Sequence, residues 1–294
     1  MPFGSQQPDR AAPAASAPGS PPRPSVSVLM AVYGGDRAPW FAEALESVAA
    51  QTVAPDQLVL VVDGPVGPEH EEAIARYRSD PRVGSVEIVR LRANQGLARA
   101  LNAGLERCGG EWTMRMDSDD LCHPDRLRHQ IAHIQEHPDI GIVSSWCEEF
   151  FDGEAATRVK SSPIQHDAVV QALRWRNVLV HPTVLIRTET LSRVGGYRTE
   201  FGRLEDYDLF VRLALEGARF HVLPAALVRV RASLAQSARR GGWRYSLNEI
   251  RFRTFCLRAG FLNPAQYVAI TSAYMAFRLA GPALRGRLYG LARV

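Results

Sequence analysis

Four short runs rich in apolar residues recur at regular intervals over the first 120 residues, and a segment of helical character separates each run from the next. The first two runs are almost wholly apolar, which is typical of strands that are buried on both faces of a parallel sheet. The intervening segments carry apolar residues at helical spacing, as at Phe41, Leu45 and Val48. The predicted strands are Val26–Val32, Leu58–Val62, Val86–Leu91 and Trp112–Met116.

This alternation predicts an α/β fold, with a doubly wound, mostly parallel sheet and helices on both of its faces. Beyond residue 120 the same patterns predict further elements, while residues 147–163 are expected to be irregular. The further helices are expected at Pro124–Glu136, Ala168–Trp175, Glu189–Val194 and Glu205–Leu215, and the further strands at Ile140–Trp146, His181–Ile186 and Phe220–Val230.

Composition divides the chain into three parts. Residues 1–24 consist largely of Ala, Pro, Ser, Gly and Gln, lack the apolar region of a signal peptide, and are expected to be a disordered tail. Residues 25–231 form the predicted α/β domain, and residues 232–294 form a helical extension with basic and apolar segments. Since no stretch reaches the roughly 18 apolar residues of a spanning helix, we expect a cytoplasmic protein.

The helical extension has two interpretations that the residues leave open. It contains ordinary packing helices with solvated arginines, or an interfacial segment that contacts the inner face of a membrane peripherally. The basic residues behind the second interpretation are Arg231, Arg239, Arg240, Arg244, Arg251, Arg253, Arg258, Arg285, Arg287 and Arg293.

Charge and cysteine content exclude some classes of function. The 294 residues carry a formal charge of +4, an excess too small to indicate a nucleic-acid-binding protein. The four cysteines form no C-x-x-C pair, which is typical of reduced residues in a cytosolic protein. His123, His133 and His137 do not match a zinc motif, and they are interpreted as residues of a helix surface.

Carboxylates follow three of the predicted strands, at the edge of a doubly wound sheet where ligands bind. Asp117 and Asp119 are alternate residues of an extended segment and can share a face, where Mg²⁺ or Mn²⁺ would relieve their repulsion. The alternative is a solvated turn with a helix cap. Asp63 ends the second strand, where it binds a base or ribose, or is simply a turn residue before Gly64.

Two adjacent acids, Glu205 and Asp206, open another predicted helix. They act as a general base for an acceptor hydroxyl, or they only favour the positive end of the helix dipole. Beside a metal–diphosphate site, the general base becomes the preferred interpretation.

Seven motifs occur in an order and at spacings that resemble the family 2 glycosyltransferases, which have the GT-A fold. The resemblance extends over Ser25–Arg231 and is greatest to the bacterial capsule and exopolysaccharide branch. The segments are SVLMAVYGGD, LVLVVDGP, NQGLARALNAGLE, MRMDSDDLCHPDRL, HPTVLIR, VGGYR and LEDYDLFVRLA.

The resemblance implies inverting transfer of a sugar from a nucleoside-diphosphate sugar, with UDP-sugars favoured, to a hydroxyl of a saccharide or lipid-linked saccharide. It implies Asp206 as the catalytic base beside Glu205, Asp117 and Asp119 as ligands of Mn²⁺ or Mg²⁺, and an acceptor side near His181, Gly196 and Tyr197. The donor or nucleotide site would comprise Ala31, Tyr33, Asp36, Asp63, Asn94, Gly96, Arg99, Asp117 and Ser118.

Other functions are weighed against this one. A nucleotidyltransferase, or a nucleotide-sugar-binding protein without glycosyl transfer, is the main alternative, although the loop Tyr33–Asp36 is short and acidic for a triphosphate site. A dehydrogenase is disfavoured because G-x-G-x-x-G is missing after the first strand. A non-enzymatic interaction protein would not need these carboxylates together. The Gln-x-x-Arg-Trp signature of processive synthases is absent, which favours single additions.

Overall fold

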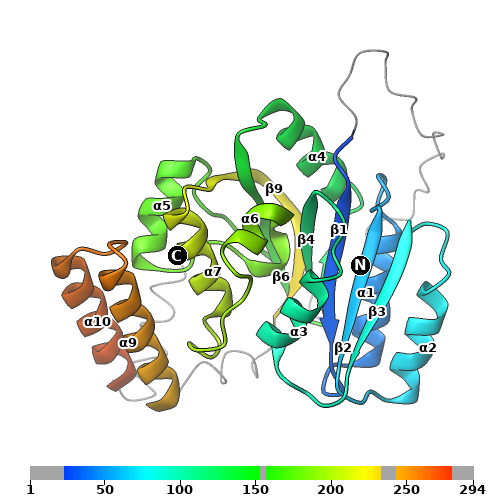
Figure 1. Ribbon diagram of the computed structural model, residues 1–294, viewed down its shortest axis with the longest axis horizontal. Helices are drawn as coiled ribbons and strands as arrows, with labels where there is room; N and C mark the ends of the chain where they lie inside the picture. The colour runs from blue at the N-terminus through cyan, green and yellow to red at the C-terminus, as the bar shows by residue number, and fades with distance from the viewer. Residues whose placement is uncertain (1–22, 153–156, 233–242, 280–294) are drawn as a thin grey trace.

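Nine strands form one mixed sheet in the residues described by the computed structural model, which are 23–152, 157–232 and 243–279. Along the sheet the strands lie in the order β3-β2-β1-β4-β8-β6-β9-β5, and β7 pairs with β6 off this path. Helices cover both faces of the sheet (Figure 1). The predicted tail at residues 1–24 lies almost entirely outside the described residues.

The first four strands form the parallel half of the sheet that the apolar runs predict. Strand β1 pairs in parallel with both β2 and β4, and β2 pairs in parallel with β3. Their carboxyl ends therefore meet at one edge. The bounds are β1 Val26–Val32, β2 Gln57–Asp63, β3 Ser85–Leu91 and β4 Trp112–Asp117.

The second half of the sheet mixes strand directions. Strand β8 runs antiparallel to β4 and β6, whereas β6 and β9 are parallel. Short strands β5 and β7 add antiparallel pairs to β9 and β6. The bounds are β5 Leu121–Cys122, β6 Ile140–Phe150, β7 Thr157–Lys160, β8 Leu185–Arg187 and β9 Arg219–Arg231.

The two faces of the sheet bury two separate hydrophobic cores, because alternate residues of each strand point to opposite faces. Leu29 and Val59 join α3, α5, α7 and α9 in one core, while Val28 and Leu58 join α1, α2 and α4 in the other. The bounds are α1 Ala38–Ala49, α2 Pro68–Tyr77, α3 Leu97–Leu105, α4 Arg126–Glu136, α5 His166–Trp175, α6 Thr188–Arg193, α7 Glu205–Leu215, α9 Trp243–Arg258 and α10 Pro264–Leu279.

Two predictions of local structure are wrong. Residues 147–163 are not all irregular, because Cys147–Phe150 extend β6 along β9 and Thr157–Lys160 form β7. His181–Ile186 is not one strand. Residues His181–Thr183 form a 3₁₀ turn before β8, since Pro182 has no N–H to donate to a strand ladder.

Helices α9 and α10 lie at the end of the molecule opposite α2, beside α5 and α7 (Figure 1). Phe252 of α9 packs into the core that α7 shares. Within the described residues, no helix combines the length and the apolar character that crossing a membrane requires.

Two arginines that the sequence suggested for a membrane surface are instead buried. Arg231 ends β9 and Arg253 lies on α9, with exposed fractions of 3% and 1%. Burial with bonded partners makes both unavailable to lipid. Of the other arginines named there, Arg251 and Arg258 are exposed, whereas Arg239, Arg240, Arg285, Arg287 and Arg293 lie outside the described residues.

Candidate active site

The carboxyl ends of β1 and β4 bring predicted site residues into direct contact. Ala31 of β1 lies opposite Asp117 of β4. In the loop after β1, Asp36 Oδ2 accepts a hydrogen bond of 2.7 Å from Ser118 Oγ and one of 3.2 Å from Tyr33 N. Burial raises the pKa of Asp36, and the nearby charge of Asp117 raises it further. The sheet thus brings the segments SVLMAVYGGD and MRMDSDDLCHPDRL together at one edge.

Asp63 ends β2, and its carboxylate holds the loop before α3. Its two oxygens accept hydrogen bonds from Gln95 N at 2.7 Å and Gly96 N at 2.9 Å. Gly64 has φ +85°, and a Cβ there would lie 2.5 Å from Asn94 N, so glycine permits the close approach. Asp63 therefore orders the predicted nucleotide loop. Its contact to a base or ribose stays a prediction.

The acidic loop after β4 crowds three carboxylates. Buried Arg115 pairs with the carboxylate of Asp117 and also donates to the carbonyl of Met116. Burial, followed by repulsion from Asp117 and Asp36, raises the pKa of Asp119 to about 7. Burial and the same crowding raise the pKa of Asp120 well above its ordinary value. The negative charge of the loop is thus incompletely compensated by the protein.

Arg231, the last residue of the predicted α/β domain, contacts this loop directly and holds it in place, a role that sequence reasoning missed. Its backbone N donates to Asp120 Oδ1 at 2.8 Å, and its Nε donates to Asp119 O at 2.9 Å. The guanidinium also pairs with Glu43 at 2.6 Å and with Asp152. It lies over the rings of Trp40 and Phe150, 4.6 and 4.8 Å from their centroids. The ion pairs and ring contacts hold the Arg231 side chain in position, and its bond to the Asp119 carbonyl fixes the backbone of the acidic loop.

Glu205 and Asp206 begin α7 and face the same site. Burial, followed by the charges of Asp206 and Asp117, raises the pKa of Glu205 to about 7. Asp206 Oδ2 accepts a hydrogen bond of 2.8 Å from Asn177 Nδ2, and its Oδ1 accepts one of 2.7 Å from Tyr207 N. These bonds fix the orientation of the Asp206 carboxylate. Asn177 follows α5 and carried no signal in the sequence.

The raised pKa of Glu205 predicts a pH-dependent stability in the absence of ligands. Because its folded-state pKa lies above the unfolded value, Glu205 stabilises the folded chain below about pH 4.5, and this contribution is lost as the pH rises through about 7. Glu205→Gln removes the ionisable group. The variant should therefore gain up to about 3 kcal/mol relative to wild type between pH 4.5 and 8.

Urea unfolding at pH 4.5 and pH 8, without metal, measures this difference. Glu189→Gln is a matched control, since Glu189 lies exposed in the first turn of α6. Equal changes with pH in Glu205→Gln, the control and wild type would contradict the burial of the Glu205 charge.

His181 and Tyr197 lie beneath the carboxylates, not on an open surface. His181 Nε2 and Tyr197 Oη share a hydrogen bond of 3.0 Å, and both residues are buried. Burial lowers the pKa of His181 well below its usual value and raises that of Tyr197. Both rings therefore form a neutral floor for the site at pH 7. A direct contact of these residues to an acceptor stays a prediction.

Asn102 of α3 clamps the glycine turn before Tyr197. Its amide accepts from Tyr197 N at 2.8 Å and donates to Tyr197 O at 2.7 Å. Gly196 has φ +64°, and a Cβ there would lie 2.5 Å from Asn102 Oδ1. Only glycine satisfies both the backbone angle and this close contact. The turn is thus fixed against the helix that follows the predicted nucleotide loop.

The remaining predicted donor residues are open to solvent at the same edge. Tyr33 is 37% exposed, and Asn94 is also exposed. Arg99 projects from the first turn of α3 and makes no hydrogen bond or ion pair with any described residue. Gly96, with φ +88°, precedes the helix and has open space where a Cβ would lie. These groups are available to a ligand, and their roles stay predictions.

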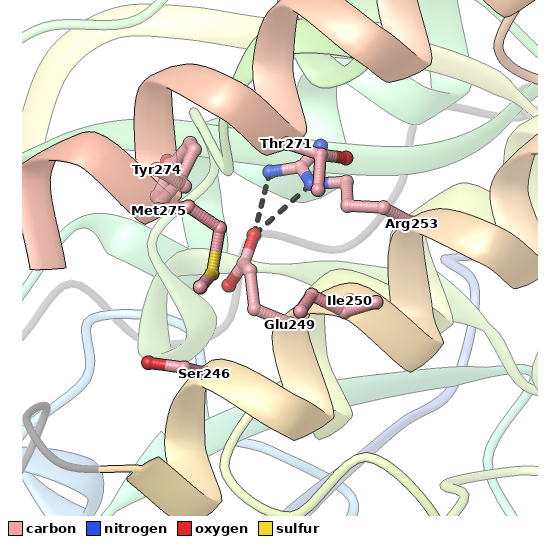
Figure 2. Close-up of a pocket in the computed structure, with 7 residues that line it drawn as sticks. All are labelled: Ser246, Glu249, Ile250, Arg253, Thr271, Tyr274 and Met275. Carbon is pink, nitrogen blue, oxygen red and sulfur yellow. Dashed lines mark hydrogen bonds and ion pairs between the residues drawn. The ribbon is translucent and has the colours of Figure 1, made fainter. Parts of the chain in front are cut away.

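A separate pocket lies between α9 and α10, away from these carboxylates (Figure 2). Its lining residues are Ser246, Glu249, Ile250, Arg253, Thr271, Tyr274 and Met275. The ion pair of Glu249 with Arg253, at 2.9 Å, lies along its wall. The pocket is a packing gap of the helical extension and contributes nothing to the carboxylate site.

Comparisons with known proteins agree on one family. Residues 27–194 match the family model described as Glycosyl transferase family 2. The chain is 33% identical over 247 residues to the amylovoran biosynthesis glycosyltransferase AmsE of Erwinia amylovora, covering 83% of this chain and 91% of that protein. It is 32% identical over 267 residues to an Escherichia coli UDP-Gal:alpha-D-GlcNAc-diphosphoundecaprenol beta-1,3-galactosyltransferase, covering 90% and 95%.

Solved structures share the fold. S. aureus TarS in complex with UDP-GlcNAc superposes with a TM-score of 0.67 at 19% identity, over 85% of this chain and 71% of that one. The mannosyltransferase PcManGT of Pyrobaculum calidifontis, in complex with GDP-Man and Mn²⁺, gives 0.61 at 21% identity, over 95% and 83%. The likeness confirms the predicted GT-A fold. With the family match and the two curated relatives, it establishes that the chain belongs to glycosyl transferase family 2.

Proposed function

We propose that this chain transfers a sugar, with inversion, from a UDP-sugar to a hydroxyl of a lipid-linked saccharide in cell-surface polysaccharide synthesis. The observation that carries the proposal is that three acidic segments meet at one edge of the sheet. Ser118 of the loop after β4 donates a hydrogen bond to Asp36. Asp117 of the same loop lies close enough for its charge to raise the pKa of Glu205, after burial and Asp206. The name of the E. coli relative specifies a UDP-Gal donor and a diphosphoundecaprenol-linked acceptor, which supports this substrate class.

The acidic loop fits a divalent cation. Asp117 and Asp119 offer only oxygen atoms as ligands. Burial, followed by the charges of Asp117 and Asp36, raises the pKa of Asp119 to about 7, and a bound cation would offset the repulsion among these carboxylates. Such oxygen ligands suit Mn²⁺ or Mg²⁺, which would neutralise the leaving diphosphate as a Lewis acid. Buried Asp120 already accepts a bond from Arg231 N and supports the loop. The Mn²⁺ complex of PcManGT agrees with this proposal.

Asp206 is the proposed catalytic base. The hydrogen bonds from Asn177 and Tyr207 orient its carboxylate, and an ionised carboxylate is the kind of group that can take a hydroxyl proton. Removal of that proton makes the acceptor oxygen a better nucleophile for the anomeric carbon. A single displacement inverts the configuration and needs no covalent intermediate. Glu205 lies beside the base, and because burial raises its pKa to about 7, the charge of its carboxyl group changes with pH near neutrality.

The domain boundaries and the membrane contact are also proposals. The transferase domain would comprise residues 25–231, and the helical extension 232–294 would support it through α9. Peripheral contact with the inner face of a membrane would bring the site to a lipid-linked acceptor. Exposed Arg251 and Arg258 on α9 are the described arginines of the extension that remain available for anionic lipid.

Thermal unfolding with nucleotides and metal tests the donor site. UDP with Mn²⁺ should raise the melting temperature by roughly 5 °C or more at saturating ligand, because only the folded chain binds it. Asp119→Asn should lose most of this shift, and GDP and dTDP should give smaller shifts. No shift with any nucleotide in folded wild type would instead favour a protein that does not use nucleotide sugars.

A further inference from the structure

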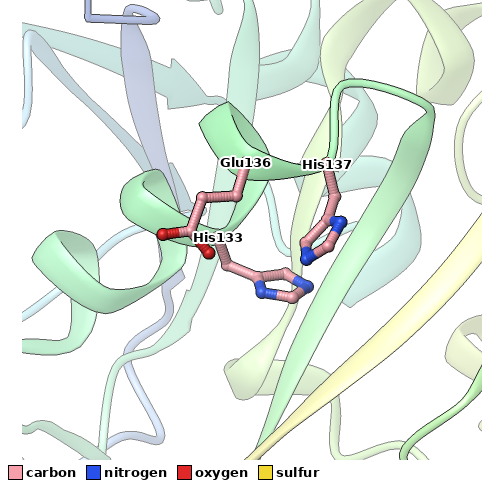
Figure 3. Close-up of side chains that lie close together, drawn as sticks. All are labelled: His133, Glu136 and His137. Atoms are coloured by element: carbon pink, nitrogen blue, oxygen red, sulfur yellow. The ribbon is translucent and has the colours of Figure 1, made fainter.

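Three potential metal ligands meet where α4 ends. His133 and Glu136 belong to the last turn of the helix, and His137 immediately follows it. Spacings of three and four residues place side chains on one helical face. One ligand atom from each of these residues lies within 4.8 Å of those from the other two (Figure 3). In the figure the two imidazole rings and the Glu136 carboxylate gather on the same side of the helix end.

A third imidazole joins this group from β9. The His221 ring stacks on that of His133, with centroids 4.2 Å apart and an interplanar angle of 28°. The centroids of His133 and His137 are 4.6 Å apart, and those of His137 and His221 are 6.3 Å apart. Three histidines from two separate elements therefore converge beside one carboxylate.

Ring nitrogens in this cluster lack the partners that buried polar atoms normally have. His133 Nε2 and His221 Nδ1 are buried without a hydrogen-bond partner among the described residues. Burial, followed by the neighbouring imidazoles, lowers the pKa of His133 to about 4, and burial also lowers that of His221. A buried ring nitrogen without a hydrogen-bond partner is the kind of group that can bind a metal, because metals bind the deprotonated nitrogen of imidazole.

We propose that His133, Glu136 and His137 form a Zn²⁺ site, against which the His221 ring of β9 stacks. Imidazole nitrogen with a carboxylate is a ligand set that suits Zn²⁺, whereas Mg²⁺ and Mn²⁺ prefer the oxygen-only set of Asp117 and Asp119. Zn²⁺ would give the buried His133 ring a partner for its nitrogen. The negative charge of Glu136 would offset part of the double positive charge of the ion.

The position of the cluster indicates a structural role. His221 lies near the start of β9, whereas Arg231 ends the same strand at the acidic loop. At roughly 3.3 Å per residue, about 30 Å of strand separates the two. A metal at the cluster would hold together the end of α4, on which the His221 ring of β9 packs, and would stabilise the fold without touching donor or acceptor.

Sequence reasoning considered His123 with His133 and His137 and found no zinc motif. The structure groups a different set, because His123 lies before α4 and accepts a bond from Asp125 N, while His221 is brought in by β9. The spacing of His133, Glu136 and His137 was the signal available in the sequence. The contribution of His221 required the fold.

Zinc uptake by the full chain tests the proposal. The protein is kept in millimolar Mg²⁺, so that Mg²⁺ occupies the proposed site at Asp117 and Asp119. It is then titrated with Zn²⁺ in competition with a chromophoric chelator, and melting temperatures are recorded. Wild type should bind one zinc per chain and melt at a higher temperature, with the gain reversed by EDTA. His133→Gln and His137→Gln should each weaken zinc binding at least ~10-fold.

His129→Gln is the matched control, because His129 is an exposed residue of the same helix outside the cluster. It should bind zinc as wild type does. Exposed His137 is not part of the core, so His137→Gln should retain the melting temperature of zinc-free wild type. The proposal is overturned if wild type takes up no zinc, or if both cluster variants bind it as tightly as the control.

Discussion

Replacing Asp206 by Asn is expected to lower the rate of sugar transfer by about 10²–10⁴-fold, the usual contribution of a positioned general base. Asparagine keeps the size of the side chain and can still accept a hydrogen bond from Tyr207 N. It cannot take a proton from the acceptor hydroxyl. Donor binding should therefore be unchanged, and the loss should appear in kcat when UDP release is measured with a lipid-linked saccharide acceptor.

Asp167→Asn is the matched control for this experiment. Asp167 is an exposed acid in the first turn of α5, so it shares the helix position of Asp206 without facing the site. The control should turn over as wild type does. Wild-type turnover by Asp206→Asn would refute the assignment, and a large loss in Glu205→Gln alone would move the role of base to Glu205.

Replacing Arg231 by Met should have the second large effect, because it removes the cation that holds the acidic loop. The side chain is buried, but its partners Glu43 and Asp152 are about half exposed. The full cost of breaking a buried ion pair is therefore reduced, and we expect unfolding to become easier by about 2–3 kcal/mol. The loop should also lose order, so that UDP with Mn²⁺ binds at least ~10-fold more weakly.

Urea unfolding and nucleotide titration measure the two parts of this prediction. Arg231→Lys keeps a charge but cannot span the same partners, and it should fall between wild type and Met. Arg219→Met is the control, since Arg219 is exposed at the opposite end of β9 and its one ion pair among the described residues is with exposed Asp139. Unchanged nucleotide affinity in folded Arg231→Met would show that the loop is organised without this arginine.

The parallel half of the fold could be predicted from the sequence because each strand is a short run rich in apolar residues and is followed by turn or loop residues. The four predicted strands of this half agree with β1 to β4 to within one residue at each end. The later strands carried weaker signals. Strand β7 is exposed along its whole length, so no alternation of apolar and polar residues marks it. Strand β5 has two residues and is defined only by its pairing with β9.

The site shows the same division between local and tertiary information. Motif residues such as Asp36, Asp117 and Asp206 are recognisable because strand and helix ends place them. The residues that orient them are not. Asn102 and Asn177 act through partners remote in the sequence, and their own surroundings in the chain are ordinary. Such contacts depend on packing between elements, which hydrophobic periodicity does not encode.

The bond from Arg231 to the Asp119 carbonyl has a consequence for how the protein is made. The two residues are 112 positions apart. At translation rates of about 5–20 residues per second, Arg231 at the end of β9 is synthesised roughly 5 to 20 seconds after the acidic loop. A nascent chain that has passed Asp206 but stops short of Arg231 therefore carries every carboxylate of the site without the arginine that holds the loop, so nucleotide binding should guide folding only weakly until synthesis of the domain is nearly finished.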